Sequence, residues 1–244
     1  LEDGEGAMRV ASGILKAMQD SFEIDGLSLA ITPSIGVALY PADGADVDTL
    51  MRNADNAMYH AKSAGRNTCR FFSPEMDAEA HERFVIERDL RLALSRDEFE
   101  LHFQPQLDSG EGRLIGAEAL LRWRHPKRGL LSPSQFLAIA EESGLIVPIG
   151  EWVLRAACRQ ARAWADAGMP IRVAVNLSAQ QFRRGNVSET VRAALAEAGL
   201  PPDRLELELT ESMLLHPTAD VLARLGELNE LGVRLSLDDF GTGY

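Results

Sequence analysis

The amino-acid sequence predicts an α/β fold, a barrel of the TIM-like (β/α)8 type preceded by part of an α+β domain. From about residue 97, short apolar strands alternate with helices, a composition typical of parallel strands that are covered on both faces. About five such strands are present, whereas a closed barrel needs eight, so we expect a truncated barrel. Before residue 74, helices and short strands follow one another without this strict alternation.

The composition limits the classes of function. Of the 244 residues, 45% are hydrophobic, which is enough for a sizeable core and for one to two domains. The net charge of −12 argues against a surface that coats DNA or RNA, because such a surface needs clustered Lys and Arg. A small phosphorylated ligand stays open, since a few arginines and metal ions can reverse the local field.

The sequence also predicts a cytoplasmic location. Its two cysteines, Cys69 and Cys158, lack the spacing of a metal site or a disulfide framework, which suits a reducing compartment. We expect no membrane span or signal peptide within it, because no run of about 18 apolar residues occurs. Both ends look cut, so we expect a longer parent protein whose sensory or membrane segments lie upstream.

Residues 1–73 are expected to form the first, partial domain. Asp25-Gly26 is typical of a hairpin turn, because both residues tolerate positive φ angles, and we expect it to join the two strands that follow. Gly65 is expected to end the second helix as its C-cap. The predicted helices span 7–21 and 47–64, and the predicted strands span 27–31, 34–40 and 68–72.

Residues 74–96 are expected to form a helix that links two domains, and residues 97–244 the second, partial domain. The linker has apolar residues at helical spacing, such as Ile86 and Leu90. Ser132 to Gln135 form a capping box that starts a helix. The predicted strands of the second domain span 98–107, 113–122, 172–177, 205–209 and 233–237, with further helices at 149–167 and before Gly199 and Gly232.

Oxygen-bearing side chains stand where successive predicted strands end. In a barrel these ends converge on one face. Carboxylate and amide oxygens select Mg²⁺, Mn²⁺ or Ca²⁺ rather than zinc, and the adjacent Asp238 and Asp239 repel one another unless cations neutralise them. The pattern therefore favours a two-metal site, although each residue taken singly is also typical of a solvated strand edge. The residues concerned are Gln104, Glu118, Asn176, Glu208, Asp238 and Asp239.

The strand that carries Glu118 ends in a charged, ring-bearing turn. The guanidinium of Arg122 offers a fork of donors that matches phosphate oxygens, and the structural alternative is a surface salt bridge to a nearby Glu. The rings of Trp123 and His125 are expected to have a structural role, by packing at the loop and capping its turn. We do not expect His125 to be catalytic.

Glu118-Ala119-Leu120-Leu121-Arg122-Trp123 resembles the signature of the EAL family, whose members hydrolyse cyclic di-GMP. The resemblance extends from about residue 80 to the end of the chain, with further motifs in the family's order. These are Gln104-Pro105, Asn176-Leu177-Ser178, Glu206 to Ser212 and Asp238 to Tyr244.

The resemblance implies residue roles. One metal ion would be held by Glu118, Asn176, Glu208 and Asp238, and a second by Asp238 and Asp239, both ions being Mg²⁺ or Mn²⁺. Glu211 would anchor the loop that follows Asp239. The implied catalytic residues are therefore Glu118, Asp238, Asp239 and Glu211, and the implied substrate-binding residues are Gln104, Leu120 and Arg122.

The implied activity is metal-dependent hydrolysis of cyclic di-GMP to linear pGpG. The resemblance also implies a Lys and further acidic and amide residues beyond Tyr244. The alternatives are a sensor that binds cyclic di-GMP without cleaving it, and a module that only mediates dimer contacts. We expect a homodimer formed through the EAL-like part.

The first part of the chain has its own likeness. Ser34-Ile35-Gly36-Val37-Ala38 and the stretch from Ala54 to Asn67 resemble the C-terminal half of a GGDEF domain, the diguanylate cyclase fold. By this resemblance Lys62 and Arg66 would reach the phosphates of GTP in the parent protein. The alternative is that these cations complement the dipole of a helix end. The family's signature loop is missing, so we expect no cyclase activity from this segment.

Overall fold

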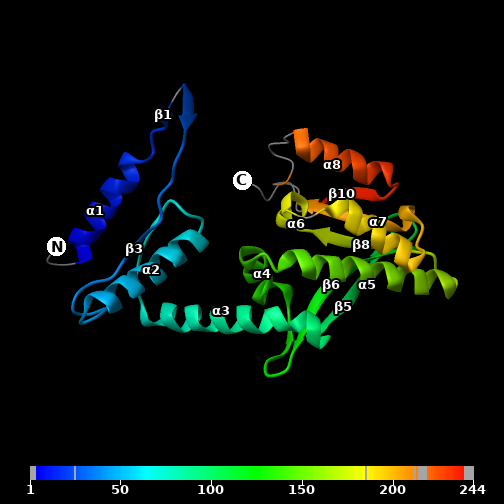
Figure 1. Cartoon of the computed structure of the whole chain (residues 1–244), viewed down its shortest axis with the longest axis horizontal. Coiled ribbons are helices and arrows are strands. Elements are labelled where there is room, and N and C mark those ends of the chain that lie inside the picture. Colours follow the sequence, from blue (N-terminus) through cyan, green and yellow to red (C-terminus); the bar gives the residue numbers. More distant parts are fainter. Residues whose placement is uncertain (1–3, 25, 185, 211–212, 214–218, 239–244) are drawn as a thin grey trace. The chain divides into compact units, whose positions relative to one another are not determined.

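The computed structural model describes residues 4–24, 26–184, 186–210, 213 and 219–238, and the chain divides into two compact units, residues 1–85 and 86–244 (Figure 1). Helix α3 (Pro74–Ala93) contains the point of division. The predicted site residues Glu211 and Asp239, and the glycine turn 240–244, lie outside the described residues. None of the described helices is long and apolar enough to cross a membrane.

The first unit has helices that pack against short strands. Helix α2 begins after Asp46, whose carboxylate accepts the backbone N–H of Thr49 at 2.8 Å as an N-cap. A Cβ on Gly36 would lie 2.0 Å from the carbonyl oxygen of Ala54, so glycine allows β3 to approach α2 closely. The elements of this unit are α1 (Gly4–Ala17), β1 (Phe22–Ile24), β2 (Leu27–Leu29), β3 (Ile35–Val37), α2 (Val47–Ser63) and β4 (Cys69–Phe71).

The hairpin turn joins different strands from those predicted. It connects β1 to β2, which pair antiparallel with Phe22 opposite Leu29. The next strand, β3, pairs in parallel with β4 instead, with Ile35 opposite Cys69. Parallel strands need a crossover connection, and α2 supplies it. The prediction was wrong because Phe22–Ile24, short and exposed, carried no clear strand pattern in the sequence.

The second unit is a six-stranded sheet with helices packed against it. Its helices are α4 (Leu137–Ser143), α5 (Ile146–Asp166), α6 (Ala179–Arg184), α7 (Val187–Ala198) and α8 (Ala219–Glu230), with short 3-10 turns at Leu94–Arg96, Pro133–Gln135 and Pro202–Arg204. Its strands are β5 (Phe99–Leu107), β6 (Leu114–His125), β7 (Gly129–Leu131), β8 (Arg172–Leu177), β9 (Leu205–Thr210) and β10 (Arg234–Asp238).

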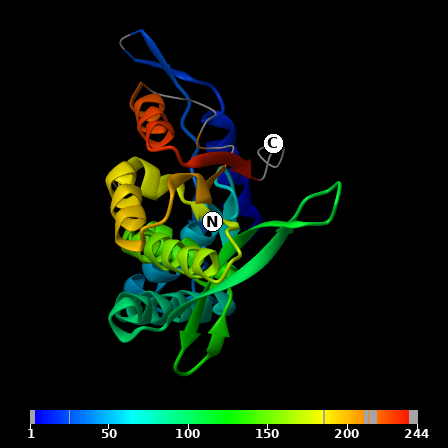
Figure 2. The ribbon, with the colours of Figure 1, turned by 90° about the vertical axis from the view of Figure 1, so that its right-hand side faces the viewer.

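The strands lie in the order β10-β9-β8-β6-β5, and β7 pairs with the far end of β6. The pairs from β6 through β8 and β9 to β10 are parallel, whereas β5 and β7 run antiparallel to β6. Strands β5 and β6 form a long hairpin whose turn extends away from the neighbouring strands (Figure 2). The sheet is therefore parallel where the βα units repeat and antiparallel at its first hairpin.

One face of this sheet is apolar and forms the core. In β9 the residues Leu205, Leu207 and Leu209 are at most 2% exposed. In β8 the corresponding residues Val173, Val175 and Leu177 are equally buried. They form one core with helices such as α5, which buries Ile149, Leu154, Ala157 and Cys158. The side chains that alternate with these residues along the strands lie on the other face of the sheet, away from the helices. We call this face the polar face.

Candidate functional site

The strand registers place every described site candidate of the second unit on the polar face. Asn176 lies opposite Glu208 across β8 and β9, and Glu208 lies opposite Ser236 across β9 and β10. Side chains alternate between the two faces along a strand, so residues two apart share a face. Glu118 pairs with Ala174, two residues before Asn176, and Asp238 pairs with Thr210, two residues after Glu208. All four predicted ligands of the first metal therefore face the same side.

Glu118 and Asn176 are in direct contact. The side-chain N–H of Asn176 donates to Oε1 of Glu118 at 2.7 Å, although the two residues are 58 positions apart in the sequence. An amide has both a donor and an acceptor. Asn176 can therefore orient the carboxylate of Glu118 with its nitrogen and keep its carbonyl oxygen available for a cation.

Glu208 carries an electrostatic strain that a cation would relieve. Burial, followed by the charges of Glu118, Asp238 and Glu206, raises the pKa of Glu208 to about 7, against a small lowering by a hydrogen bond from Gln106. Its Oε2 is buried and has no hydrogen-bond partner among the described residues. A buried oxygen of this kind costs free energy unless something pairs with it.

The donor set fits a hard divalent cation. Glu118, Asn176, Glu208 and Asp238 offer carboxylate and amide oxygens, which Mg²⁺ and Mn²⁺ prefer. Within the described part of the chain, no three Asp, Glu, His or Cys side chains already form a metal-binding group. The structure shows the contact of Glu118 with Asn176 and the repulsion of Glu208 by the charges of Glu118 and Asp238.

The predicted substrate-binding residues lie on the same face. Gln104 is opposite Glu118 in the antiparallel pair of β5 and β6, and Leu120 and Arg122 follow Glu118 at alternate positions. Sequence reasoning placed Gln104 and Glu118 at strand ends, and this was wrong, because both lie inside their strands. Strand β6 continues to His125 because β7 pairs with its last residues.

Arg122 is half-buried and donates from Nη1 to the carbonyl oxygen of Leu121 at 2.8 Å. The predicted alternative, a salt bridge of Arg122 to a Glu, is not among its described contacts. Glu100, the residue opposite Arg122, instead accepts from His102 at 2.9 Å and from Arg124 at 2.6 Å. These two hydrogen bonds, that of His102 first, lower the pKa of Glu100. Arg122 therefore does not depend on an ion pair with Glu100.

A cavity of about 290 Å³ lies between strands β6 and β8 and the helices α4 and α5. It is lined by Leu120, Glu141, Ile149, Asn176 and Thr210, among others. Burial, and then the charge of Glu142, raises the pKa of Glu141. Glu141 was not predicted from the sequence, although the charged pair directly after the apolar run Leu137–Ala140 indicated a carboxylate at the end of a short helix.

A largely buried ion pair lies on the polar face next to the metal candidates. Nη1 of Arg172 is 3.1 Å from Oε2 of Glu206, and both side chains are about four-fifths buried, with 22% and 17% exposed. Glu206 precedes Glu208 by two residues and shares its face. This pair was also missed, although the alternation Leu-Glu-Leu-Glu-Leu in residues 205–209 indicated two glutamates on one face.

In the first unit, Lys62 and Arg66 are both exposed near the C-terminal end of α2. Arg66 has a positive φ of 61° and follows Gly65, whose φ is 101°. Nothing in the described contacts assigns a phosphate ligand to either residue, so their role stays a prediction.

The sequence profile of the EAL domain matches residues 87–244, more than half of the chain. The chain therefore belongs to the EAL domain family. A profile described as diguanylate cyclase, GGDEF domain, matches residues 1–68. The order predicted from the motifs, GGDEF and then EAL, is confirmed.

Among curated proteins, the chain is similar to the bifunctional diguanylate cyclase/cyclic di-GMP phosphodiesterase MucR of Pseudomonas aeruginosa, with 48% identity over 239 residues, 98% of this chain and 35% of MucR. It is also 44% identical over 232 residues to the cyclic di-GMP phosphodiesterase NbdA of the same species, covering 95% of this chain and 30% of NbdA. The chain thus spans about a third of the length of these relatives.

A solved structure described as PaMucR phosphodiesterase in complex with c-di-GMP is similar to this chain. The TM-score is 0.63 and the identity 50%, with 65% of each chain covered. The EAL enzyme Bd1971, in a form with cAMP and cyclic di-GMP bound, has a TM-score of 0.62 and 29% identity, covering 68% of this chain and 46% of Bd1971. These likenesses confirm the predicted α/β, TIM-barrel-like fold class.

Proposed function

We propose that residues 86–244 belong to a metal-dependent phosphodiesterase that hydrolyses cyclic di-GMP to linear pGpG. One observation carries the proposal: the registers of β6, β8, β9 and β10 bring Glu118, Asn176, Glu208 and Asp238 to one face, beside Arg122. Membership in the EAL family supports it, as do the names of MucR and NbdA, which describe this activity for those proteins.

We assign one divalent cation, Mg²⁺ or Mn²⁺, to Glu118, Asn176, Glu208 and Asp238, and a second to Asp238 and Asp239. The unpartnered Oε2 of Glu208 and its raised pKa support the first of these sites. When bound, a pair of such cations lowers the pKa of water and stabilises negative charge on phosphate oxygens. Asn176 keeps the carboxylate of Glu118 oriented for this task.

The substrate is held by the other residues of the polar face. Arg122 donates its guanidinium fork to the oxygens of the phosphate, exchanging its hydrogen bond with the carbonyl of Leu121. Leu120 lines the groove for the rest of the ligand, and Gln104, opposite Glu118, contributes an amide. These contacts fix the phosphate so that water can approach in line with the leaving oxygen.

In the reaction, the oxygen of water forms a bond to phosphorus and the bond between phosphorus and the 3′ oxygen breaks. One proton of the water goes to the 3′ oxygen, either directly or through solvent. The ring opens to a chain with a 5′ phosphate and a free 3′ hydroxyl, which is pGpG. Glu211 and Asp239 complete the proposed catalytic set with Glu118 and Asp238.

The family resemblance also supports proposals on the domain bounds, the GTP contacts, the oligomeric state and the location of the protein. Residues 1–73 are part of a GGDEF domain, in which Lys62 and Arg66 contact GTP in the whole protein; residues 74–96 form the linker, and residues 97–244 are part of the EAL domain. The protein is a homodimer through its EAL domain and works in the cytoplasm. The GGDEF profile match over residues 1–68 supports the first of these statements.

The test is a hydrolysis assay with the natural polypeptide that carries this sequence. It is incubated with cyclic di-GMP and either Mg²⁺ or Mn²⁺, and pGpG is followed by chromatography. The expected result is metal-dependent formation of pGpG that is lost in Glu118→Gln. Tight binding of cyclic di-GMP without product, with both metals, would instead support a sensor. Retained affinity for cyclic di-GMP in both Glu118→Ala and Arg122→Ala would remove this face from the function.

A further inference from the structure

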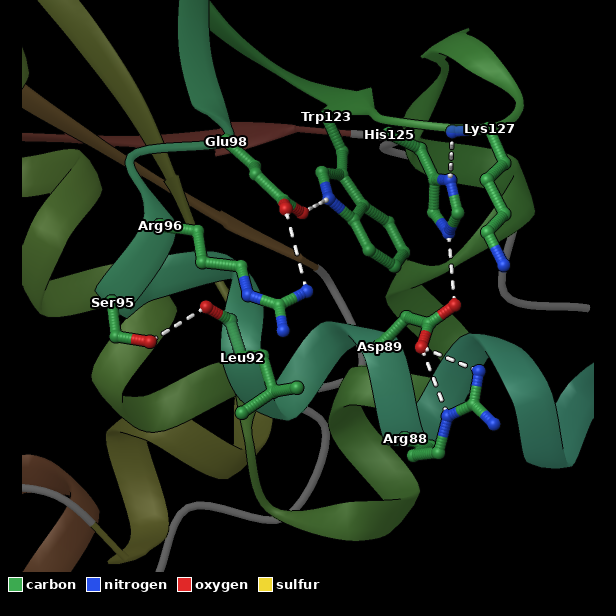
Figure 3. A network of polar contacts seen from close by, with 9 residues as sticks. All are labelled: Arg88, Asp89, Leu92, Ser95, Arg96, Glu98, Trp123, His125 and Lys127. Atoms are coloured by element: carbon green, nitrogen blue, oxygen red, sulfur yellow. Dashed lines mark hydrogen bonds and ion pairs between the residues drawn. The ribbon is translucent and has the colours of Figure 1, made fainter.

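A network of polar contacts joins the end of β6 to helix α3 and to the segment that follows it (Figure 3). Figure 3 shows Asp89 reaching from α3 toward the ring of His125, and Glu98 reaching toward the indole of Trp123. The proposed mechanism uses none of these residues. They lie within the second unit, and the strand they contact also carries Glu118, Leu120 and Arg122.

The first half of the network is the pair Asp89 and His125. His125 is 3% exposed, and its Nε2 lies 3.2 Å from Oδ2 of Asp89. Its Nδ1 accepts the backbone N–H of Lys127 at 3.1 Å. Because Nδ1 accepts, the proton of the neutral ring is on Nε2, which donates to Asp89.

The carboxylate of Asp89 is kept charged for this contact. Its Oδ1 accepts from Nε and Nη2 of Arg88 at 3.0 Å and 2.8 Å. Burial works to raise the pKa of Asp89, but the hydrogen bond and charge of Arg88, followed by the hydrogen bond of His125, outweigh it and lower the pKa. Asp89 therefore remains an acceptor for the ring of His125 at neutral pH.

The second half of the network is formed by Glu98. The indole N–H of Trp123 donates to Oε2 of Glu98 at 2.9 Å, and the backbone N–H of Arg124 donates to its carbonyl oxygen at 2.7 Å. Trp123 is fully buried, and its ring lies 5.6 Å from that of Phe136. Both halves of the network thus hold the side of β6 that faces the core.

This anchoring matters because the strand partners of β6 change at this end. Its pairing with the neighbouring parallel strand β8 covers only Gly116 to Ala119. Beyond Ala119, the described strand partners of β6 are the antiparallel strands β5 and β7. Leu120 and Arg122, which point to the polar face, thus lie beyond the stretch that β8 holds in register with the proposed metal ligands.

We propose that Asp89 and His125 are positioning residues: they hold the end of β6 against α3 and so set the place of Arg122 relative to the metal ligands. The alternation of side chains provides the link, because Trp123 and His125 are held on the core side while Arg122 faces the substrate. The inference rests on the proposed function for the identity of the substrate, but the link from α3 to β6 does not depend on it.

The test uses His125→Ala and Asp89→Ala in the full chain. Binding of cyclic di-GMP is measured by calorimetry in EDTA, so that no hydrolysis occurs. We expect each variant to raise the Kd roughly three- to tenfold, since a small displacement of a phosphate-binding group has an effect of this order or larger. His125→Gln should recover most of the affinity, because its amide N–H can reach Asp89 in place of Nε2–H.

A matched control separates positioning from stability. Leu195→Ala truncates a buried side chain on α7. Leu195 is 6% exposed and lies far from β6 along the chain. This control variant should lower the melting temperature at least as much as the two test variants, yet leave the Kd unchanged. If His125→Ala and Asp89→Ala melt earlier but bind as tightly as the wild type, the contacts are only structural and the proposal is overturned.

Hydrogen exchange provides a readout that needs no ligand. In His125→Ala and Asp89→Ala, amides of residues 120–125 should exchange faster than in Leu195→Ala, while those of β9 should not differ. If the wild type does not bind cyclic di-GMP, the proposed function fails and exchange alone decides the role of Asp89 and His125. Unchanged exchange across residues 120–125 would then overturn the positioning role.

Discussion

The two faces of the sheet in the second unit differ in burial and in charge, and strand β9 contributes residues to both. Leu205, Leu207 and Leu209 are almost completely buried against the helices. Glu206 and Glu208, which alternate with them, place carboxylates on the polar face, where Glu208 is repelled by its neighbours. One face stabilises the fold by burying apolar area, whereas the other maintains an unfavourable concentration of charge.

The contrast between the two faces indicates where function resides in the strand. Natural proteins retain destabilising groups mainly where a ligand or a reaction uses them. Substitutions on the polar face should therefore change activity without lowering stability, whereas substitutions on the apolar face should lower stability and leave the site intact.

The largest effect is expected from Glu118→Gln. The glutamine oxygen can still accept the N–H of Asn176, but the charge that a divalent cation needs is gone. We expect pGpG formation to fall by about a thousandfold or more, which corresponds to about 4 kcal/mol in the barrier. The free energy of unfolding should not fall by more than about 0.5 kcal/mol, because the substitution removes a charge that repels Glu208. Activity within tenfold of the wild type would contradict the assignment of Glu118.

The apolar face should give the opposite result. Leu207 is 0% exposed, so Leu207→Ala leaves a cavity between sheet and helices. We expect the free energy of unfolding, measured with urea, to fall by about 2–5 kcal/mol. Leu207→Met is the matched control, since it conserves volume and should cost less than about 1.5 kcal/mol. Under conditions where Leu207→Ala is folded, its affinity for Mn²⁺ should equal that of the wild type; a large loss would break the separation of the faces.

Arg122→Lys should affect the substrate but not the metal. Lysine keeps the charge and loses the planar fork that grips a phosphate at two oxygens. We expect KM for cyclic di-GMP to rise by about tenfold, with Mn²⁺ affinity unchanged. Arg124→Lys, next but one on the same face, is the control and should alter KM by less than about twofold, because Arg124 is bound to Glu100 at the surface. Equal effects of the two substitutions would contradict a specific role for Arg122.

The strain on Glu208 should appear as a pH dependence of stability. Its pKa is about 7 in the folded protein against a usual value of 4.5, so between these values the folded state binds more protons than the unfolded state. The contribution of Glu208 to stability is therefore fully present below pH 4.5 and is lost as the pH rises through about 7. Urea unfolding in EDTA across this range should show this loss in the wild type and not in Glu208→Gln.

The exposed Glu189 on α7 serves as the control for this experiment, because Glu189→Gln should keep the wild-type pH dependence. Saturating Mn²⁺ should also remove the difference between pH 5 and pH 7, because the cation binds the deprotonated carboxylate. The same slope in the wild type and in Glu208→Gln would show that another group causes it.

The smallest effect is expected from Ser236→Ala. The hydroxyl of Ser236 lies opposite Glu208 and is buried with no hydrogen-bond partner among the described residues. Removing this unpartnered hydroxyl should raise the free energy of unfolding by about 1 kcal/mol and leave Mn²⁺ affinity as it is. A clear loss of Mn²⁺ affinity would add Ser236 to the metal site.

Sequence reasoning predicted the elements of the second unit well, because period-two and helical patterns are local. It placed strands at 172–177 and 205–209, and the structure has β8 at Arg172–Leu177 and β9 at Leu205–Thr210. It began a helix at residue 149, whereas α5 begins at Ile146, since Pro148 is tolerated in a first helical turn. Pairing was harder, as the hairpin around Asp25-Gly26 shows, because strand partners depend on distant residues.

The candidate site was predicted in its residue types but not in its contacts. The hydrogen bond of Asn176 to Glu118 and the charge repulsion at Glu208 arise from the registers of β6, β8 and β9, which a single sequence does not reveal. The same holds for the ion pair of Arg172 with Glu206 and for the contact of Asp89 with His125, both between residues far apart in the sequence. His125 was predicted to be structural, and its burial among Asp89 and Trp123 agrees with this.

The most direct test of the central claim is a calorimetric titration with Mn²⁺ of the wild type and of Glu118→Gln, Asn176→Ala, Glu208→Gln and Asp238→Asn. If these four side chains share a cation, each substitution should weaken the Mn²⁺ affinity by at least about tenfold, whereas the core variant Leu195→Ala should bind like the wild type. Wild-type affinity in all four variants would show that the polar face does not hold a metal.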